Sequence, residues 1–338
     1  MRISDHDLDR RVFVIAEIGN NHEGSYALAE DLVGLAAGAG VDAVKFQTIV
    51  PERLVSKDQE DRLRQLRRFQ LTYGEFERLH AVAHGEGVEF LSTPFDVESV
   101  AFLAPLVPAF KIASSDNTFR PLLRAVAGTG KPLLLSTGLV GSAEIAGIKR
   151  FVNERWASLG VSQDLALLHC VTSYPTPPSE AGLLAIPYLK ETFGTTVGYS
   201  DHTLGIKAGV LAVAVGARIV EKHFTLDKHY STFRDHQLSA DPSEMKELVD
   251  RIREAEEMLG MYGKEIQPSE RGVVRALRRS VVASRDLGRG HVLGPDDVLW
   301  LRATDGWSPS DEDGFVGRAL QADVCSGEPI LPSMLTDR

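Results

Sequence analysis

Cysteine is scarce in this chain of 338 residues. Only Cys170 and Cys325 occur, far apart in sequence and in no CxxC pattern. A disulfide framework or a cysteine-based zinc site is therefore not expected. Cys170 lies in the apolar run LALLHC, where we expect a small buried thiol.

The chain also lacks a hydrophobic run long enough to span a membrane. Its most apolar segment, AGVLAVAVGA, ends at Arg218, well short of the ~20 residues that a spanning helix needs. The first residues, MRISDHDLDRR, are too polar for the apolar part of a secretory signal. We therefore expect a cytoplasmic protein that does not enter the membrane.

Positive charge is in deficit, because 37 Lys and Arg face 47 Asp and Glu and give a net charge of -10. Surfaces that bind nucleic acid or anionic membranes need clustered Lys and Arg in excess, so neither partner is expected. A small anionic substrate needs only a few local cations and stays possible. The hydrophobic fraction of 43% is typical of a globular protein.

What the sequence does have is a regular alternation of short apolar runs with helical segments. Strands that alternate with helices pair in parallel, and continuous apolar runs indicate burial on both faces. Eight strand–helix units in about 260 residues are typical of a (β/α)8 TIM barrel. An open doubly wound sheet is the alternative, but no GxGxxG follows the first strand. The predicted strands cover residues 12–16, 42–46, 88–92, 109–113, 132–136, 165–169, 195–199 and 218–222.

The pattern changes after residue 260. Residues 276–338 contain short β-like pieces broken by Gly, Pro and Asp, without a sustained helical period. We therefore predict a barrel over residues 1–260, a linker over 261–275 and a small, mostly-β domain over 276–338. Inside the barrel, the charged stretch from about residue 52 to residue 87 is predicted to be helical, with a solvated face.

Every predicted strand ends in hydrogen-bonding or ionisable residues, at the end where barrels gather their active sites. His202 and His223 follow the last two strands, which places both at one rim. Neutral imidazoles are the commonest protein ligands of borderline divalent metals, and two of them leave positions open for substrate oxygens. We predict a catalytic metal there, and we interpret His169 as structural and His229 and His236 as solvated.

Lys45 and Lys111 lie inside otherwise apolar strands, where an unpaired ammonium is costly. Either they pair with barrel carboxylates such as Glu17 and Glu221, or they hold an anion, and we favour the anion. Two cations beside several hydroxyls suit a phosphate or a phosphate–carboxylate compound. The hydroxyls belong to Thr93, Ser114, Ser136 and Ser200. A Schiff-base lysine, as in aldolase barrels, is the competing interpretation.

Eight motifs in this order identify a family: FVIAEIGNNHEGS, VKFQT, STPFD, FKIASSD, KPLLLSTG, LLHCVTSYPTP, VGYSDHT and EKHFTLD. With them the chain resembles the sialic acid synthase family over nearly its whole length. The stretch RRSVVASRDLGRGHVLGPDDVLWLR resembles the small antifreeze-like (SAF) domain that follows the barrel in that family. The resemblance implies condensation of phosphoenolpyruvate with an amino-sugar aldose such as N-acetylmannosamine. It also implies a nine-carbon 2-keto-3-deoxy acid and phosphate as products, and a divalent metal, usually manganese.

The resemblance also implies roles for single residues. His202 and His223 would hold the metal, while Glu17 or Glu221 would move a proton beside Lys45. Phosphoenolpyruvate would contact Lys45, Thr93, Lys111, Ser114, Ser136 and Ser200. The acceptor pocket would include Gln47, Tyr174, Asp235 and Arg302. Because the family's small domain reaches over the barrel of a partner subunit, a domain-swapped homodimer is implied as well.

The sequence departs from the family pattern around the acceptor. Ala303 stands where the family's small domain carries an arginine, and Arg302 stands at its lysine position. The run STFRDHQL replaces the usual Gly-Pro lead-in to Asp235, and Asn20 replaces an apolar residue. The alternative to an N-acetylmannosamine-like acceptor is therefore a non-acylated or different aldehyde. A non-catalytic sugar-acid binding protein is disfavoured, because every ionisable residue of the expected site is present.

Overall fold

The computed structural model describes residues 1–303 and 305–337. Contacts between Cα atoms divide the chain into two units, Met1–Gly260 and Met261–Arg338. The residues predicted as a linker, 261–275, are grouped by these contacts with the second unit. None of the helices in the described part of the chain has the length and apolar character needed to span a bilayer.

The first unit is built around eight parallel strands. They are hydrogen-bonded in the order β5-β4-β3-β10-β9-β8-β7-β6, and the two end strands, β5 and β6, also contact each other. The sheet therefore forms a nearly closed barrel, which confirms the predicted TIM-barrel class over the open sheet. The strands are β3 Phe13–Gly19, β4 Ala43–Thr48, β5 Glu89–Pro94, β6 Phe110–Ile112, β7 Leu133–Ser136, β8 Leu165–Cys170, β9 Val197–Asp201 and β10 Ile219–His223.

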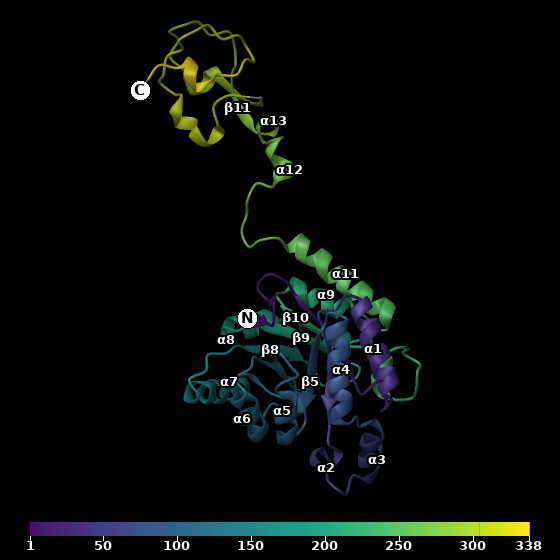
Figure 1. Ribbon diagram of the computed structural model, residues 1–338. Helices are drawn as coiled ribbons and strands as arrows, with labels where there is room; N and C mark the ends of the chain where they lie inside the picture. The colour runs from purple at the N-terminus through teal and green to yellow at the C-terminus, as the bar shows by residue number, and fades with distance from the viewer. Residues whose placement is uncertain (304, 338) are drawn as a thin grey trace. The chain divides into compact units, whose positions relative to one another are not determined.

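Helices follow the strands and lie around them (Figure 1). They are α1 Tyr26–Gly38, α5 Val97–Leu103, α6 Arg120–Gly128, α7 Ser142–Ser158, α8 Ala185–Phe193, α9 Lys207–Ala214, α10 Arg234–Leu238 and α11 Pro242–Leu259. The predicted long helix after β4 is divided into α2 Pro51–Leu54, α3 Glu60–Phe69 and α4 Tyr73–Gly85. A capping box starts α4, because the Thr72 hydroxyl accepts from the Glu75 backbone while the Glu75 carboxylate accepts from the Thr72 backbone.

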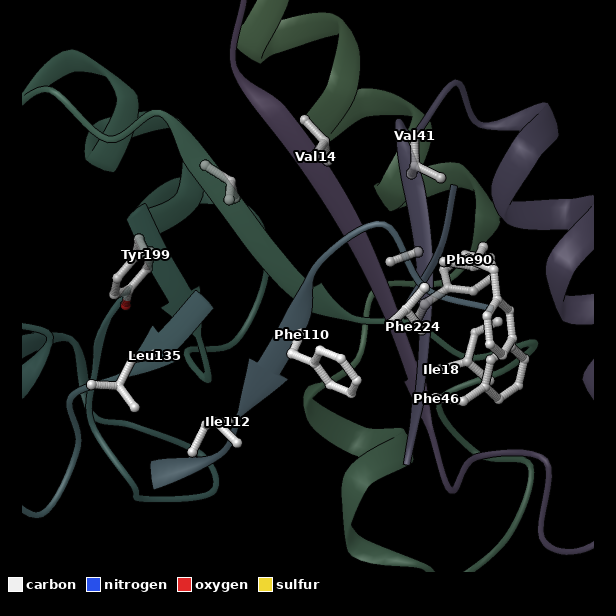
Figure 2. Close-up of a cluster of buried hydrophobic side chains, with 14 of the residues drawn as sticks. Val14, Ile18, Val41, Phe46, Phe90, Phe110, Ile112, Leu135, Tyr199 and Phe224 are labelled. Carbon is white, nitrogen blue, oxygen red and sulfur yellow. The ribbon is translucent and has the colours of Figure 1, made fainter. Parts of the chain in front are cut away.

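Side chains along each strand alternate between the inside and the outside of the barrel. In β3, Val14 and Ile18 belong to the core between strands and helices, whereas Phe13 and Ile15 belong to the core inside the barrel. Figure 2 shows part of the outer core. The next inward residue after Ile15 is Glu17, so the inside of the barrel turns polar toward the carboxyl ends of its strands.

The amino-terminal end of the barrel is filled by apolar side chains. A short hairpin, β1 Arg2–Ile3 with β2 His6–Asp7, leads into the first barrel strand. Ile3 and Leu8 are fully buried against the inner core beside Phe13. The hairpin therefore closes this end, and the polar groups inside the barrel lie at the opposite one.

The second unit has a small antiparallel sheet of β11 Arg279–Ala283 and β12 Val298–Arg302. Isolated bridges, such as those joining Leu287 to Val324 and Leu320 to Leu335, extend its β character. Two short helices, α12 Pro268–Arg271 and α13 Val274–Leu277, precede the sheet. This architecture confirms the predicted small, mostly-β domain.

Candidate active site

Inward alternation brings four charged side chains to the carboxyl end of the barrel: Glu17 from β3, Lys45 from β4, Lys111 from β6 and Glu221 from β10. Each of these residues is at most 4% exposed. Burying charges is costly and requires pairing or a ligand. Four of them in one place therefore indicate a site rather than a solvated face.

The four groups form one ion network. The Lys45 Nζ atom lies 2.6 Å from Glu17 Oε2 and 3.7 Å from Glu221 Oε2. The Lys111 Nζ atom lies 2.8 Å from Glu221 Oε1. The sequence left carboxylate pairing and anion binding as alternatives, and the structure shows the pairing that we did not favour. Anion binding by the same two ammoniums stays a prediction.

The two carboxyls have different electrostatic surroundings. At Glu17, burial raises the pKa; Lys45 offsets only part of this effect, and the repulsion from Glu221 adds to it. Burial acts in the same direction at Glu221, but Lys111 and Lys45 together outweigh it and hold the pKa below its ordinary value. Two neighbouring carboxyls with pKa values pushed apart can divide the work of proton carrier and fixed anion.

A chain of amides orients Glu17. The Gln47 Nε2 atom donates to Glu17 Oε1 at 2.9 Å, and Asn20 Nδ2 donates to Gln47 Oε1 at 2.9 Å. Gln47, predicted as an acceptor residue, therefore contacts a predicted catalytic carboxylate. Asn20 belongs to the site as well, and its polar side chain at a place usually apolar in the family is the signal that marks it.

Two of the predicted hydroxyls bond to the ion network. Thr93 Oγ1 accepts from Lys45 Nζ at 3.2 Å, and Ser200 Oγ donates to Glu221 Oε1 at 2.8 Å. The structure therefore brings both residues to the predicted phosphoenolpyruvate site.

Other hydroxyls surround the turn after β7. The buried hydroxyls of Ser136 and Thr172 have no hydrogen-bond partner among the described residues. The Ser114 hydroxyl accepts from the Gly138 backbone at 3.1 Å. A Cβ atom at Gly138 would lie 2.3 Å from Thr172 Oγ1 and 2.6 Å from Ser114 Oγ, so only glycine fits there. Because buried polar atoms are rarely left unbonded, this turn has donors to offer a ligand, and Thr172 joins the predicted residues.

The two predicted metal ligands face each other at the same end of the barrel. The ring centroids of His202 and His223 are 5.4 Å apart, and both side chains are buried. Two imidazoles on one ion hold their centroids about 5 to 6 Å apart, because a metal–nitrogen bond is about 2 Å long. The separation therefore fits a shared ion. Among the described residues, no group of three or more His, Cys, Asp or Glu could hold a metal, so the site offers two ligands.

The hydrogen bonds of these imidazoles also fit metal binding. His202 Nδ1 lies 2.8 Å from the Val171 carbonyl, which assigns the proton to Nδ1 and leaves Nε2 a free lone pair. His223 Nδ1 is buried without a partner among the described residues. Burial lowers the pKa of each histidine to about 4, and at His202 the neighbouring His223 adds to the effect. Both rings are therefore neutral near pH 7, as metal ligation requires.

Tyr174 and Asp235, predicted for the acceptor pocket, lie beside the imidazoles. The Tyr174 ring is 4.1 Å from the His202 ring and 6.0 Å from the His223 ring, measured between centroids. Asp235, on α10, is close enough to His223 to act on its pKa. Its carboxylate accepts from Arg234 Nε at 3.2 Å.

Arg302, the remaining predicted acceptor residue, ends β12 in the second unit. Its role and the domain-swapped dimer stay predictions.

For Cys170 and the other histidines, most predictions are confirmed and one is wrong. Cys170 is a buried thiol, and His169 is structural, with Nε2 2.8 Å from the Ala181 carbonyl. His229 is exposed, as predicted. The solvated interpretation of His236 is wrong, because this residue is 1% exposed. The loop after β10 folds back and encloses the imidazole, which the local sequence does not indicate.

The chain matches the model of the NeuB family over residues 32–264 and that of the SAF domain over residues 278–336. It belongs to the NeuB family. Members of this family are synthases that condense phosphoenolpyruvate with a sugar, and this chain is an enzyme of that type.

Three similar proteins illustrate the range of the NeuB family. The N,N'-diacetyllegionaminic acid synthase of Legionella pneumophila is 38% identical, over 94% of this chain and 93% of its own. A pseudaminic acid synthase of Campylobacter jejuni is 34% identical, over 98% of this chain and 99% of its own. The chain also superposes on the crystal structure of N-acetylneuraminic acid synthetase from Leptospira borgpetersenii in complex with citrate. The TM-score is 0.74 and the identity 34%, over 78% of this chain and 90% of the other. Their names agree on the class of product and differ in the sugar.

Proposed function

We propose that this protein condenses phosphoenolpyruvate with an amino-sugar aldose of the N-acetylmannosamine type, giving a 2-keto-3-deoxy sugar acid and inorganic phosphate. The product would be a sialic acid or an analogue. The observation that carries the proposal is the meeting of two neutral imidazoles and two buried lysines at one end of the barrel. These groups suit a divalent ion and an anionic substrate respectively.

The donor half uses the lysines and the unbonded hydroxyls. Phosphoenolpyruvate carries a phosphate and a carboxylate, which Lys45 and Lys111 would neutralise. Because the pKa of Glu17 is raised, this carboxyl can take up a proton, which frees Lys45 for the incoming anion. The Ser136 and Thr172 hydroxyls, unbonded among the described residues, would donate to the same substrate.

A divalent metal, with Mn²⁺ the expected ion, would be held by His202 and His223. When bound, such an ion polarises the carbonyl of the acceptor aldehyde. The Val171 carbonyl, bonded to Nδ1 of His202, fixes the tautomer that leaves the other ring nitrogen free.

The reaction joins C3 of the enolpyruvyl group to the aldehyde carbon. Water adds at C2, the C–O bond to phosphate breaks, and inorganic phosphate leaves. The aldehyde oxygen must gain a proton, and protonated Glu17 would donate it. The water loses both of its protons as C2 becomes a ketone; one would return to Glu17 and the other leaves with phosphate. Glu221 would stay ionised between the two lysines and hold them in place.

A Schiff-base aldolase is less well supported by the geometry. Such an enzyme needs a neutral amine as nucleophile. The carboxylates around Lys45 instead raise its pKa against the effect of burial, and Lys111 is paired with Glu221. The identity of the acceptor sugar is less well defined. A non-acylated aldose is the second candidate, because the departures from the family pattern at Arg234 and Ala303 both concern acceptor binding.

The direct test is phosphate release from phosphoenolpyruvate by the full chain, with Mn²⁺ and a broad panel of aldoses. We expect release with an aldose, loss of activity with a chelator, rescue by Mn²⁺, and a product whose mass is the sum of pyruvate and aldose. Borohydride with substrate should trap no adduct. Absence of release across the panel, with metal supplied, would contradict the proposal.

A further inference from the structure

The guanidinium of Arg234 lies over the ring of Tyr174, a residue predicted to bind the acceptor. Its Cζ atom lies 4.6 Å from the centre of the Tyr174 ring, and that ring lies 4.1 Å from the ring of His202. Imidazole, phenol and guanidinium therefore follow one another outward from the predicted metal site. An aldose with its aldehyde at the imidazoles would extend toward Arg234.

Most of the hydrogen-bonding capacity of this guanidinium is unused. Among the described residues its only hydrogen bond runs from Nε to Asp235 Oδ1, at 3.2 Å, and its side chain is 63% exposed. A guanidinium has five N–H donors in a planar fork that matches carbonyl, carboxylate and phosphate oxygens. The terminal nitrogens of Arg234 are therefore available to a ligand.

A second guanidinium adds positive charge at the same place. Arg62, on α3, lies close enough to Arg234 and Asp235 to interact with both charges. Its pKa is lowered, first by burial and further by repulsion from Arg234, while Asp235 attracts. Two cations around one carboxylate leave a surplus positive charge that favours an electron-rich substituent.

The segment that carries Arg234 is held in place by hydrogen bonds of the buried residues that follow it. His236, two residues on, is buried, with Nδ1 2.6 Å from Thr225 Oγ1 and Nε2 3.2 Å from Glu23 Oε1. Asn21 Nδ2 donates to Ser239 Oγ at 2.9 Å. The loops after β3 and β10 are thus tied together, and α10 is held in position by buried contacts.

We propose that Arg234 selects the acceptor by donating hydrogen bonds to an oxygen-bearing substituent of the aldose. The substituent is either the carbonyl of an acylamino group or a phosphate at the end remote from the aldehyde. The inference rests on the proposed function and adds the residue that reads the acceptor. It also gives a role to one departure from the family pattern, because Arg234 lies in the run that replaces the usual Gly-Pro lead-in to Asp235.

The test compares Arg234→Gln with the wild type on three acceptors: N-acetylmannosamine, N-acetylmannosamine 6-phosphate and mannose. Hydrogen bonds to a charged group contribute enough that the variant should lose roughly 10- to 100-fold in kcat/KM for the recognised acceptor. We expect a loss of at most a few-fold for an acceptor without that substituent, and an unchanged KM for phosphoenolpyruvate. Arg234→Lys should recover only part of the loss, since it restores the charge without the fork.

Arg251→Gln is the matched control, because Arg251 is an exposed arginine of α11 whose ion pairs, among the described residues, are with helix neighbours. It should leave all three kcat/KM values unchanged. Loss with N-acetylmannosamine relative to mannose would identify an acyl carbonyl, and loss with the 6-phosphate alone would identify a phosphate. An equal loss for all three acceptors, or none, would overturn the inference while the proposed function stands. A wild type that releases no phosphate with any aldose would overturn both.

Discussion

At the scale of single residues, two buried carboxyls of the site have pKa values shifted in opposite directions. Burial opposes ionisation of both Glu17 and Glu221. The difference comes from their neighbours. Among the described residues Glu221 forms ion pairs with two lysines, whereas Glu17 forms one with Lys45 alone. This assigns proton transfer to Glu17 and charge holding to Glu221.

The assignment predicts the behaviour of Glu17→Gln. The amide has the shape of the carboxyl but cannot supply a proton, so kcat should fall by about 100- to 10,000-fold. The KM for phosphoenolpyruvate should change little. Steady-state phosphate release measures both, with Glu52→Gln as an exposed control. A kcat within a few-fold of the wild type would show that another group moves the proton.

The unbonded hydroxyl of Ser136 predicts that its removal weakens binding of phosphoenolpyruvate without destabilising the fold. Ser136→Ala removes a donor that has no partner among the described residues, so the unfolding temperature should stay the same or rise. The KM for phosphoenolpyruvate should increase roughly 10- to 100-fold, the value of one hydrogen bond to a charged group. Ser200→Ala, which removes a bond to Glu221, should instead lower the unfolding temperature. If Ser136→Ala destabilised the fold and left KM unchanged, the hydroxyl would be structural.

The residues of the site could be predicted from sequence, but their pairing could not. Polar types at the ends of apolar runs mark the inner rim of a barrel, and the structure places Glu17, both lysines and both histidines there. Whether an ammonium faces a carboxylate or open space depends on distances across the barrel. No local pattern contains that information.

At the scale of elements, the turn after β7 depends on a glycine. A Cβ atom at Gly138 would approach the Thr172 and Ser114 hydroxyls closer than any normal contact. Gly138→Ala should therefore displace this turn, costing about 1–3 kcal/mol in the free energy of unfolding and raising the KM for phosphoenolpyruvate.

The control for this turn is Gly147→Ala. Gly147 lies inside α7 with open space around the position of an added Cβ. The substitution should stabilise the chain by about 0.5–1 kcal/mol, because alanine loses less backbone entropy in a helix. Denaturant unfolding compares the two variants, and equal effects would contradict the steric account of Gly138.

Elements with a strong period were predictable, and loops were not. The barrel strands follow continuous apolar runs and appear within a few residues of their predicted places. The break before α4 has a local signal, the Thr72 to Glu75 capping box, which hydrophobic periodicity alone does not register. The enclosure of His236 has no such signal, because its partner Glu23 lies in the loop after β3 and its partner Thr225 lies just after β10.

At the scale of the whole molecule, the two units have separate hydrophobic cores, and one carboxylate of the second unit makes its stability depend on pH. In the second unit, Asp297 accepts from His291 at 2.8 Å, from the Gly294 backbone at 2.9 Å and from Arg285 at 2.6 Å. These bonds, led by that to His291, lower its pKa from 3.8 to about 2. The stability that they contribute is present above about pH 4 and is lost as the pH falls toward 2.

Asp297→Asn should therefore lower the free energy of unfolding of the second unit at pH 7 by roughly 1–3 kcal/mol. Its unfolding temperature should fall accordingly. The difference from the wild type should shrink as the pH falls from 4 to 2. Calorimetry of the full chain measures it, with the exposed neighbour in Asp296→Asn as control. A difference that stays constant over this pH range would show that the carboxylate charge does not stabilise the unit.

The central claim is that His202 and His223 share one divalent ion beside the lysine-lined site. The most direct measurement is a titration of Mn²⁺ into the wild type and into His202→Ala and His223→Ala, with phosphate release assayed on the same samples. We predict one ion per chain in the wild type, and loss of both the ion and the activity in each variant, without loss of fold. A variant that keeps its metal and its activity would contradict the account.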